Sequence, residues 1–253
     1  MSAVNKLVGR VLRKAARMID PPPAINLLND EYVTWLCYAN AGMFEKGNLY
    51  SIDYAIGHLP SAAPILEIGT FCGLSTNVIS HFKRKHGVSN PLLTCDKWEF
   101  ENVNGHTRIA DSPVLFSEYR TFSKDSYIRN IQMFSRDDLP FTFEMTSNEF
   151  FDAWKEQTHS KDVLGRSFGL GGPISFCYID GNHTYEYAKQ DFLHCDAYLE
   201  VGGFILFDDS TLDVFSLHKL MPEIIALSRY RLVAANPYHL FQKIDSGSKT
   251  PRK

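Results

Sequence analysis

The segment Ile174-Ser-Phe-Cys-Tyr-Ile-Asp180 is a run of strand-forming residues that stops at a carboxylate, and Gly203-Phe-Ile-Leu-Phe-Asp208-Asp209 repeats this pattern later in the chain. In an open parallel sheet the carboxyl ends of the strands meet at one edge, and ligands bind outside that edge. Asp180, Asp208 and Asp209 are therefore expected to converge, where their charges would repel. A divalent cation with oxygen ligands is the simplest way to offset that repulsion.

Strand-like and helix-like segments alternate from Pro64 onward. We expect strands at 65–68, 92–95, 141–145, 174–179 and 203–207, and a closing pair at 230–234 and 239–244. We expect helices at 74–85, 124–134, 148–155, 184–199 and 214–227, and a loop at 157–172. This alternation predicts an α/β fold with a doubly wound, mostly parallel seven-stranded sheet and an antiparallel edge. The expected domains are an N-terminal helical extension (1–60), the α/β domain (61–245) and a disordered tail (246–253).

The first strand leads into a glycine-bearing turn, Glu67-Ile-Gly69-Thr-Phe-Cys-Gly73-Leu-Ser75. Glycine permits a tight turn and a close backbone approach, and the N–H groups of the next helix would point into the cleft. The acidic residue at the strand end opposes a pyrophosphate and favours a cofactor with a positive amine or sulfonium. Asp96, which ends the second strand, can accept both hydroxyls of a ribose. The alternative is a glycine turn beside an ordinary surface aspartate.

The pattern Glu-x-Gly-x-x-x-Gly, followed by an acid after the second strand, resembles the class I S-adenosylmethionine-dependent methyltransferases. The resemblance implies the Rossmann-like methyltransferase fold and S-adenosyl-L-methionine as the cofactor. The residues expected to bind that cofactor are Glu67, Gly69, Gly73, Ser75, Asp96 and Ser147.

The segment that runs from Asp180-Gly-Asn-His183-Thr-Tyr through Val201-Gly-Gly to Asp208-Asp209 resembles the metal-dependent small-molecule O-methyltransferases. These include the catechol type and the type that acts on macrolide and aminocoumarin sugars. The resemblance implies that Asp180, Asp208 and Asp209 bind Mg²⁺ or another divalent cation, and that His183 is the general base. Asp180 and His183 are thus the expected catalytic residues. An imidazole can accept a hydroxyl proton at neutral pH.

Other roles remain open for these residues. Asp208 could cap the following helix while Asp209 is solvated, and His183 could be a structural partner of a carboxylate or a metal ligand. The methyl acceptor is equally open among a sugar, a phenol and a glycan. The segments 97–123, rich in aromatic residues, and 166–172, rich in glycine, are candidates for its pocket.

Residues 4–19 predict an amphipathic helix with an apolar half and a basic half, and Pro21-Pro22-Pro23 would end it. We expect this helix to pack on its own domain or on a sister subunit, which would make the protein a homo-oligomer. Peripheral contact with an anionic membrane is the alternative.

The whole chain of 253 residues carries a formal net charge of −3, which argues against a nucleic-acid binder. Its five cysteines form no Cys-x-x-Cys pair, so we expect free thiols in the cytoplasm. Two functions compete with methyl transfer. One is a non-catalytic cofactor-binding or assembly module, which the basic helix could hold at a membrane. The other, a nicotinamide oxidoreductase, is disfavoured because no Gly-x-Gly-x-x-Gly is present.

Overall fold

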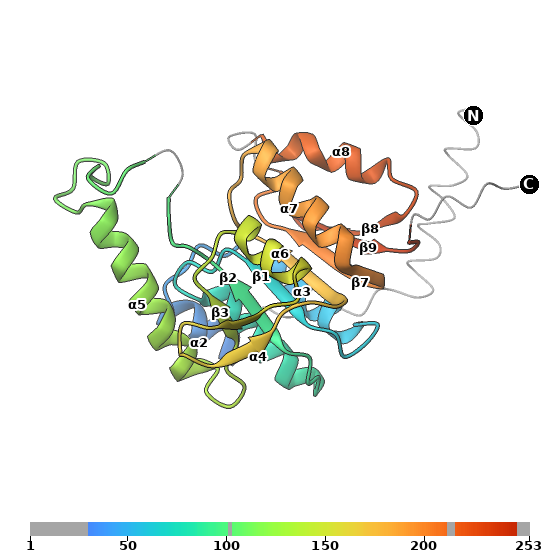
Figure 1. The fold of residues 1–253 in the computed structure, drawn as a ribbon, viewed down its shortest axis with the longest axis horizontal. Coiled ribbons are helices and arrows are strands. Elements are labelled where there is room, and N and C mark those ends of the chain that lie inside the picture. Colours follow the sequence, from blue (N-terminus) through green and yellow to red (C-terminus); the bar gives the residue numbers. More distant parts are fainter. Residues whose placement is uncertain (1–29, 101–102, 212–215, 247–253) are drawn as a thin grey trace, which may run out of the picture.

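The computed structural model describes residues 30–100, 103–211 and 216–246. Its centre is a seven-stranded sheet with the order β3-β2-β1-β6-β7-β9-β8 (Figure 1). The first five strands in this order are parallel, and β9 and β8 add an antiparallel edge. The strands are β1 (Ile65–Ile68), β2 (Leu92–Cys95), β3 (Phe141–Phe143), β6 (Ile174–Ile179), β7 (Leu199–Phe207), β8 (Tyr230–Ala235) and β9 (His239–Lys243). The expected doubly wound sheet with an antiparallel edge is confirmed.

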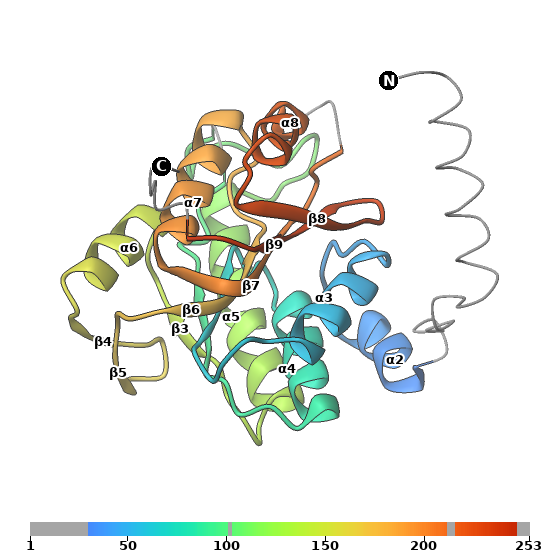
Figure 2. The ribbon, with the colours of Figure 1, turned by 90° about the vertical axis from the view of Figure 1, so that its right-hand side faces the viewer.

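Helices cover both faces of the sheet (Figure 2). One face carries α2 (Glu31–Ala39), α3 (Asn48–Gly57), α4 (Leu74–His86) and α5 (Phe116–Phe134), and the other carries α6 (Ser147–Lys155), α7 (Tyr185–Tyr198) and α8 (Leu220–Ile225). Successive strand residues point to opposite faces. Phe176 and Tyr178 therefore enter the core beneath α2, α3 and α4, whereas Cys177 and Ile179 enter the core beneath α6, α7 and α8.

Several expected boundaries were wrong. The segment 157–172, expected to be a loop, contains a hairpin of β4 (His159–Lys161) and β5 (Ser167–Gly169). The helix expected at 124–134 is the second half of the longer α5. The helix expected at 214–227 is a 3₁₀ turn, Leu217–Lys219, followed by the six-residue α8. Strand β7 begins at Leu199, four residues before the expected Gly203.

The described N-terminal helices α2 and α3 share a hydrophobic cluster with α4 and the sheet. Leu36 of α2 and Ile52 of α3 lie in the same cluster as Val78 of α4 and Phe204 of β7. Residues 4–19 and 247–253 fall outside the described residues, so the amphipathic helix, its subunit or membrane contact, and most of the predicted tail stay predictions. Within the described ranges, no helix combines the length and apolar character needed to cross a bilayer.

Candidate active site

Four neighbouring strands end in the residues that the sequence singled out. Backbone hydrogen bonds extend the parallel ladder by one residue beyond each strand, from Gly69 N to Cys95 O (3.0 Å), from Asp180 N to Ile68 O (2.8 Å) and from Asp208 N to Ile179 O (2.9 Å). In the same way, Asp96 N donates to Phe143 O (3.2 Å). Since the strand order is β2-β1-β6-β7, the glycine turn after β1 (residues 69–73, here called the cofactor turn) and the acidic strand ends form one continuous row along the ligand edge.

The turn after β1 requires glycine at two positions. Gly69 has φ +82°, and a Cβ there would lie 2.0 Å from the carbonyl oxygen of Asp180. Gly73 has φ +87° and immediately precedes α4. Only glycine adopts such conformations without strain. The close approach of Gly69 to Asp180 also joins the cofactor turn directly to the acidic side of the row.

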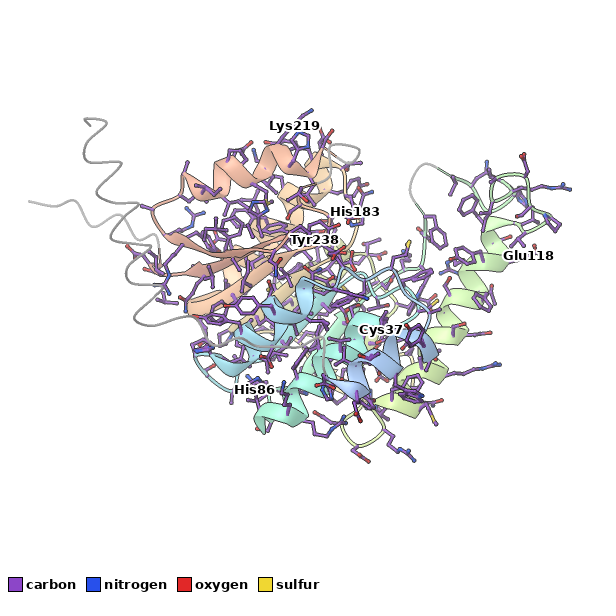
Figure 3. The ribbon with its side chains drawn as sticks, turned by 180° about the vertical axis from the view of Figure 1, so that it is seen from behind. Cys37, His86, Glu118, His183, Lys219 and Tyr238 are labelled. Atoms are coloured by element: carbon purple, nitrogen blue, oxygen red, sulfur yellow. The ribbon has the colours of Figure 1, made fainter. Side chains whose placement is uncertain are left out.

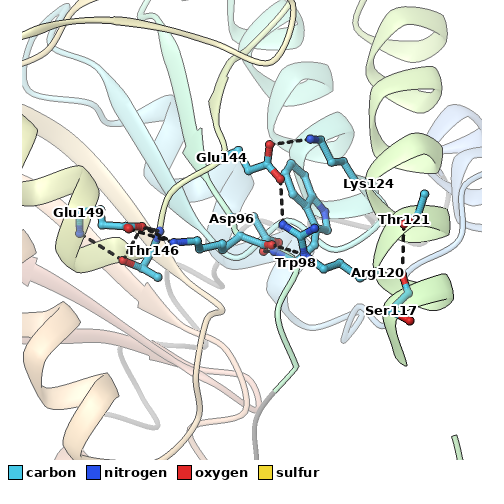
Figure 4. Close-up of polar contacts among 10 residues, drawn as sticks. Asp96, Trp98, Ser117, Arg120, Thr121, Lys124, Glu144, Thr146 and Glu149 are labelled. Atoms are coloured by element: carbon cyan, nitrogen blue, oxygen red, sulfur yellow. Dashed lines mark hydrogen bonds and ion pairs between the residues drawn. The ribbon is translucent and has the colours of Figure 1, made fainter. Parts of the chain in front are cut away.

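Asp96 is bonded to the turn itself. Its Oδ2 accepts hydrogen bonds from Thr70 N (2.7 Å) and Phe71 N (3.0 Å), and its Oδ1 accepts one from Trp98 N (2.6 Å; Figure 4). The Trp98 indole in turn donates to Phe71 O (2.8 Å). Asp96 therefore fixes the shape of the turn. Its expected bonds to a ribose stay a prediction, for which Oδ1, with a single donor, has remaining capacity.

Glu67 is fully buried on the α4 side of the sheet. Burial raises the pKa of its carboxyl to about 7, although hydrogen bonds from Ser75 and Thr76 oppose the shift. Its Oε1 has no hydrogen-bond partner among the described residues. Ser75 is a hydrogen-bond partner of Glu67, and Ser147 is one of the buried Asp191. The expected bonds of both serines to the cofactor stay predictions.

Asp180, Asp208 and Asp209 converge at the ends of β6 and β7. Burial raises the pKa of Asp208 to about 9, with further contributions from the negative charges of Asp180 and Asp209. Burial also raises the pKa of Asp180 well above its ordinary value, while a hydrogen bond with Asp208 opposes the shift. Neighbouring carboxylates cannot all ionise at low cost without a compensating positive charge. Because its pKa is raised to about 9, Asp208 keeps its proton at neutral pH in the described arrangement.

His183 lies beside two of these acids. Its Nε2 is 3.4 Å from Asp180 Oδ1 and 3.7 Å from Asp209 Oδ2. Figure 3 shows His183 near Tyr238, on the side of the molecule where the N-terminal helices meet the antiparallel edge. Within residues 30–100, 103–211 and 216–246, no three or more His, Cys, Asp or Glu side chains are already arranged as a metal-binding group.

Two site residues escaped the sequence analysis. The Nδ2 of Asn48, at the start of α3, donates to Asp208 Oδ1, and the hydroxyl of Tyr238, in the β8–β9 loop, donates to Asp209 Oδ1 (2.6 Å). Neither residue belongs to a recognisable motif, and Asn48 is 160 positions from its partner. Asn48 follows Glu45-Lys46-Gly47 and Tyr238 follows Asn236-Pro237, so no local signal distinguished either residue from an ordinary turn residue.

The segment after β2 lies at the other end of the row of strand ends. Arg120 and Lys124 of α5 both pair with Glu144 beyond β3, at 2.9 and 2.5 Å, and Lys97 pairs with Glu149 of α6 at 2.9 Å (Figure 4). Packed aromatic rings continue outward from the cofactor turn. The pairs Phe71–Tyr119 and Phe100–Phe116 are tilted, and the pairs Phe100–Tyr119 and Tyr119–Phe122 are stacked. The predicted acceptor segment 97–123 is therefore continuous with the cofactor turn.

Comparison with known proteins places the chain among methyltransferases. The family model described as "Methyltransferase domain" matches residues 66–210, which is more than half of the chain. A search of curated proteins finds no match.

Three solved structures have a similar fold. An O-methyltransferase from Bacillus cereus in complex with SAH is 13% identical with a TM-score of 0.55, and the match covers 87% of this chain and 94% of that one. The calicheamicin methyltransferase CalS11 is 16% identical with a TM-score of 0.53, and the match covers 96% of this chain and 93% of that one. The O-methyltransferase TomG from Streptomyces achromogenes in complex with SAM is 14% identical with a TM-score of 0.50, and the match covers 85% of this chain and 91% of that one. At these identities the likeness establishes the fold. The matched domain, the strand order and the glycine turn together show that this chain belongs to the methyltransferase family and has the Rossmann-like methyltransferase fold.

Proposed function

We propose that this protein transfers a methyl group from S-adenosylmethionine to a hydroxyl group of a small molecule or sugar, with the help of Mg²⁺ or another divalent cation. The observation that carries the proposal is the row of strand ends, in which a glycine turn beside two acids adjoins three further acids and a histidine. Similar folds in O-methyltransferases bound to SAH or SAM support the choice of cofactor.

The turn has the chemistry to hold this cofactor. Glu67 presents a buried oxygen without a partner among the described residues, and its pKa is raised to about 7 by burial. A cationic amine or sulfonium nearby would favour the ionised form of this carboxyl. Asp96 would bind the ribose hydroxyls while it keeps its bonds to the turn, and the N–H groups that begin α4 would meet the carboxylate of the cofactor.

The acid cluster has the chemistry to hold a divalent cation. Asp180, Asp208 and Asp209 supply hard oxygen ligands. The raised pKa values of Asp180 and Asp208 are those expected of a carboxylate cluster without a compensating positive charge. The three carboxylates would have to draw closer together around the ion, because no preformed metal group is found among the described residues. A bound divalent cation supplies a lowered pKa and a fixed orientation for an acceptor hydroxyl.

His183 would then act as the general base. It would take the proton of the acceptor hydroxyl as the oxygen–carbon bond forms and the carbon–sulfur bond of the donor breaks, which releases a neutral thioether. The leaving group is already activated, so the main task of the protein is to align oxygen, carbon and sulfur. The aromatic segment 97–123 would bind the acceptor. A sugar hydroxyl is one candidate, since CalS11 is described as a TDP-rhamnose 3′-O-methyltransferase.

The direct test is methyl transfer by the purified protein. S-adenosylmethionine is supplied with a panel of catechols and nucleotide sugars, and the demethylated cofactor is measured with Mg²⁺, with excess chelator, and after Mg²⁺ is restored. We expect turnover that chelator abolishes and Mg²⁺ recovers. Full turnover in chelator would remove the metal from the proposal. Cofactor binding by calorimetry without turnover on any diol would favour the non-catalytic module.

A further inference from the structure

The N-terminal helical region reaches the acid cluster through Asn48. Helix α3 begins at this residue and packs Leu49 and Ile52 against the sheet. The Asn48 side chain is fully buried, and its Nδ2 donates to Asp208 Oδ1 and, at 3.4 Å, to the hydroxyl of Tyr178. A buried amide thus donates to the carboxylate of Asp208, whose ionised form is destabilised by burial.

The start of α3 is held in place by the β8–β9 loop. Gly47 packs so closely on that loop that a Cβ would lie 1.8 Å from the carbonyl oxygen of Asn236. Two residues further along the loop, Tyr238 donates its hydroxyl to Asp209 Oδ1. Two elements distant in sequence thus meet, and each supplies one donor to one member of the acid pair.

These donors are a neutral amide and a neutral hydroxyl, so they can orient Asp208 and Asp209 without changing the net charge of the site. Among the ion pairs formed within the described residues, Asp180 and Asp209 have His183 as their partner, and no lysine or arginine pairs with Asp180, Asp208 or Asp209. Asn48 and Tyr238 can therefore fix the carboxylates without cancelling the negative charge that would attract a cation. The Oδ1 of Asn48 also lacks a partner among the described residues. Such a buried orphan oxygen is costly in a purely structural amide.

We propose that Asn48 and Tyr238 are positioning residues for the metal ligands, so that the N-terminal helices and the β8–β9 loop complete the acid cluster. This inference rests on the proposed metal site. Partners that hold metal ligands typically affect metal affinity by about 10- to 100-fold. Removal of either donor is therefore expected to weaken metal binding without weakening the cofactor turn, which has its own supports at Asp96 and Thr70.

The test compares Mn²⁺ binding and S-adenosylmethionine binding, each measured by calorimetry, in Asn48→Ala, Tyr238→Phe and the unaltered protein. We expect Asn48→Ala to weaken Mn²⁺ binding by about 10- to 100-fold and Tyr238→Phe by a smaller factor, with cofactor affinity unchanged in both. Ser51→Ala is the matched control, because Ser51 is a fully buried polar residue on the same helix with no partner for its hydroxyl among the described residues. It should change neither affinity.

The possible failures are distinguishable. If the unaltered protein binds Mn²⁺ no better than Asp208→Ala, the proposed metal site is wrong and this inference falls with it. If the unaltered protein binds Mn²⁺ and both variants bind it equally well, only the inference is wrong. A parallel loss of Mn²⁺ and cofactor binding would show a general structural role and would also overturn it. Should Asn48→Ala fail to fold, Tyr238→Phe, which removes one hydroxyl, decides the matter alone.

Discussion

Asp96 accepts hydrogen bonds from three backbone N–H groups around the cofactor turn, whereas Asp208, three strands further along the same row, faces two carboxylates and one amide donor. Both oxygens of the first carboxylate have backbone donors before any ligand arrives. The second carboxylate lies beside like charges, and burial together with these charges raises its pKa to about 9. The difference indicates that the cofactor turn is preformed, whereas the acid cluster lacks a compensating positive charge.

The largest expected effect lies on the acidic side of this comparison. His183→Ala should lower kcat by about 100- to 10,000-fold, the usual contribution of a general base, because no other imidazole in the described residues lies within ion-pair distance of Asp180 and Asp209. Cofactor affinity should not change, since the turn is supported independently. Steady-state kinetics and calorimetry measure the two quantities. His159→Gln, on the exposed β4–β5 hairpin, is the control. An unchanged kcat would assign His183 a structural role.

A pH series without ligands sharpens the comparison further. The folded-state pKa values of Glu67 (about 7) and Asp208 (about 9) lie above the ordinary values of 4.5 and 3.8. At a pH between the ordinary and the folded-state pKa of each group, the folded protein retains a proton that the unfolded chain has released. The free energy of unfolding should therefore fall as pH rises from 5 to 9. Glu67 alone should contribute about 2–3 kcal/mol, at about 1.4 kcal/mol per pKa unit.

Thermal unfolding across this pH range provides the measurement. Glu67→Gln should reduce the fall in melting temperature between pH 5 and pH 7. S-adenosylmethionine with Mn²⁺ should raise the melting temperature mainly at high pH. A melting temperature that rises steadily from pH 5 to pH 9 would contradict the assigned protonation states.

The smallest effect is expected at the preformed turn. Asp96→Ala removes the acceptor of Thr70 N, Phe71 N and Trp98 N and should loosen the turn. We expect about a tenfold loss of cofactor affinity, equivalent to about 1.4 kcal/mol, with Mn²⁺ affinity unchanged. Calorimetry with each ligand gives both values. Asp125→Ala, an exposed carboxylate on α5, is the matched control. If Asp96→Ala weakened Mn²⁺ binding as strongly as cofactor binding, the two regions would not be independent.

Most of the sheet could be predicted because its strands are short apolar runs bounded by turn residues, such as 65–68 and 174–179. The β4–β5 hairpin was missed because its strands have three residues each, and His159–Lys161 has no apolar pattern. The first half of α5 was missed because aromatic and polar residues alternate there without a clear helical stripe, and the stacked aromatic rings that accompany it form only in the folded chain.

The sequence by itself determined the order of the strands in the main sheet along the chain, the glycine turn and the acids at the strand ends, because each depends on local periodicity or on a short segment. Only the tertiary structure decided that Asp96 accepts hydrogen bonds from the turn, that Asp208 is buried beside the charges of Asp180 and Asp209, and that Asn48 and Tyr238 donate to Asp208 and Asp209. Those contacts join residues far apart in the chain. They arise because helix α3 and the β8–β9 loop pack together over the end of β7, which no local pattern records.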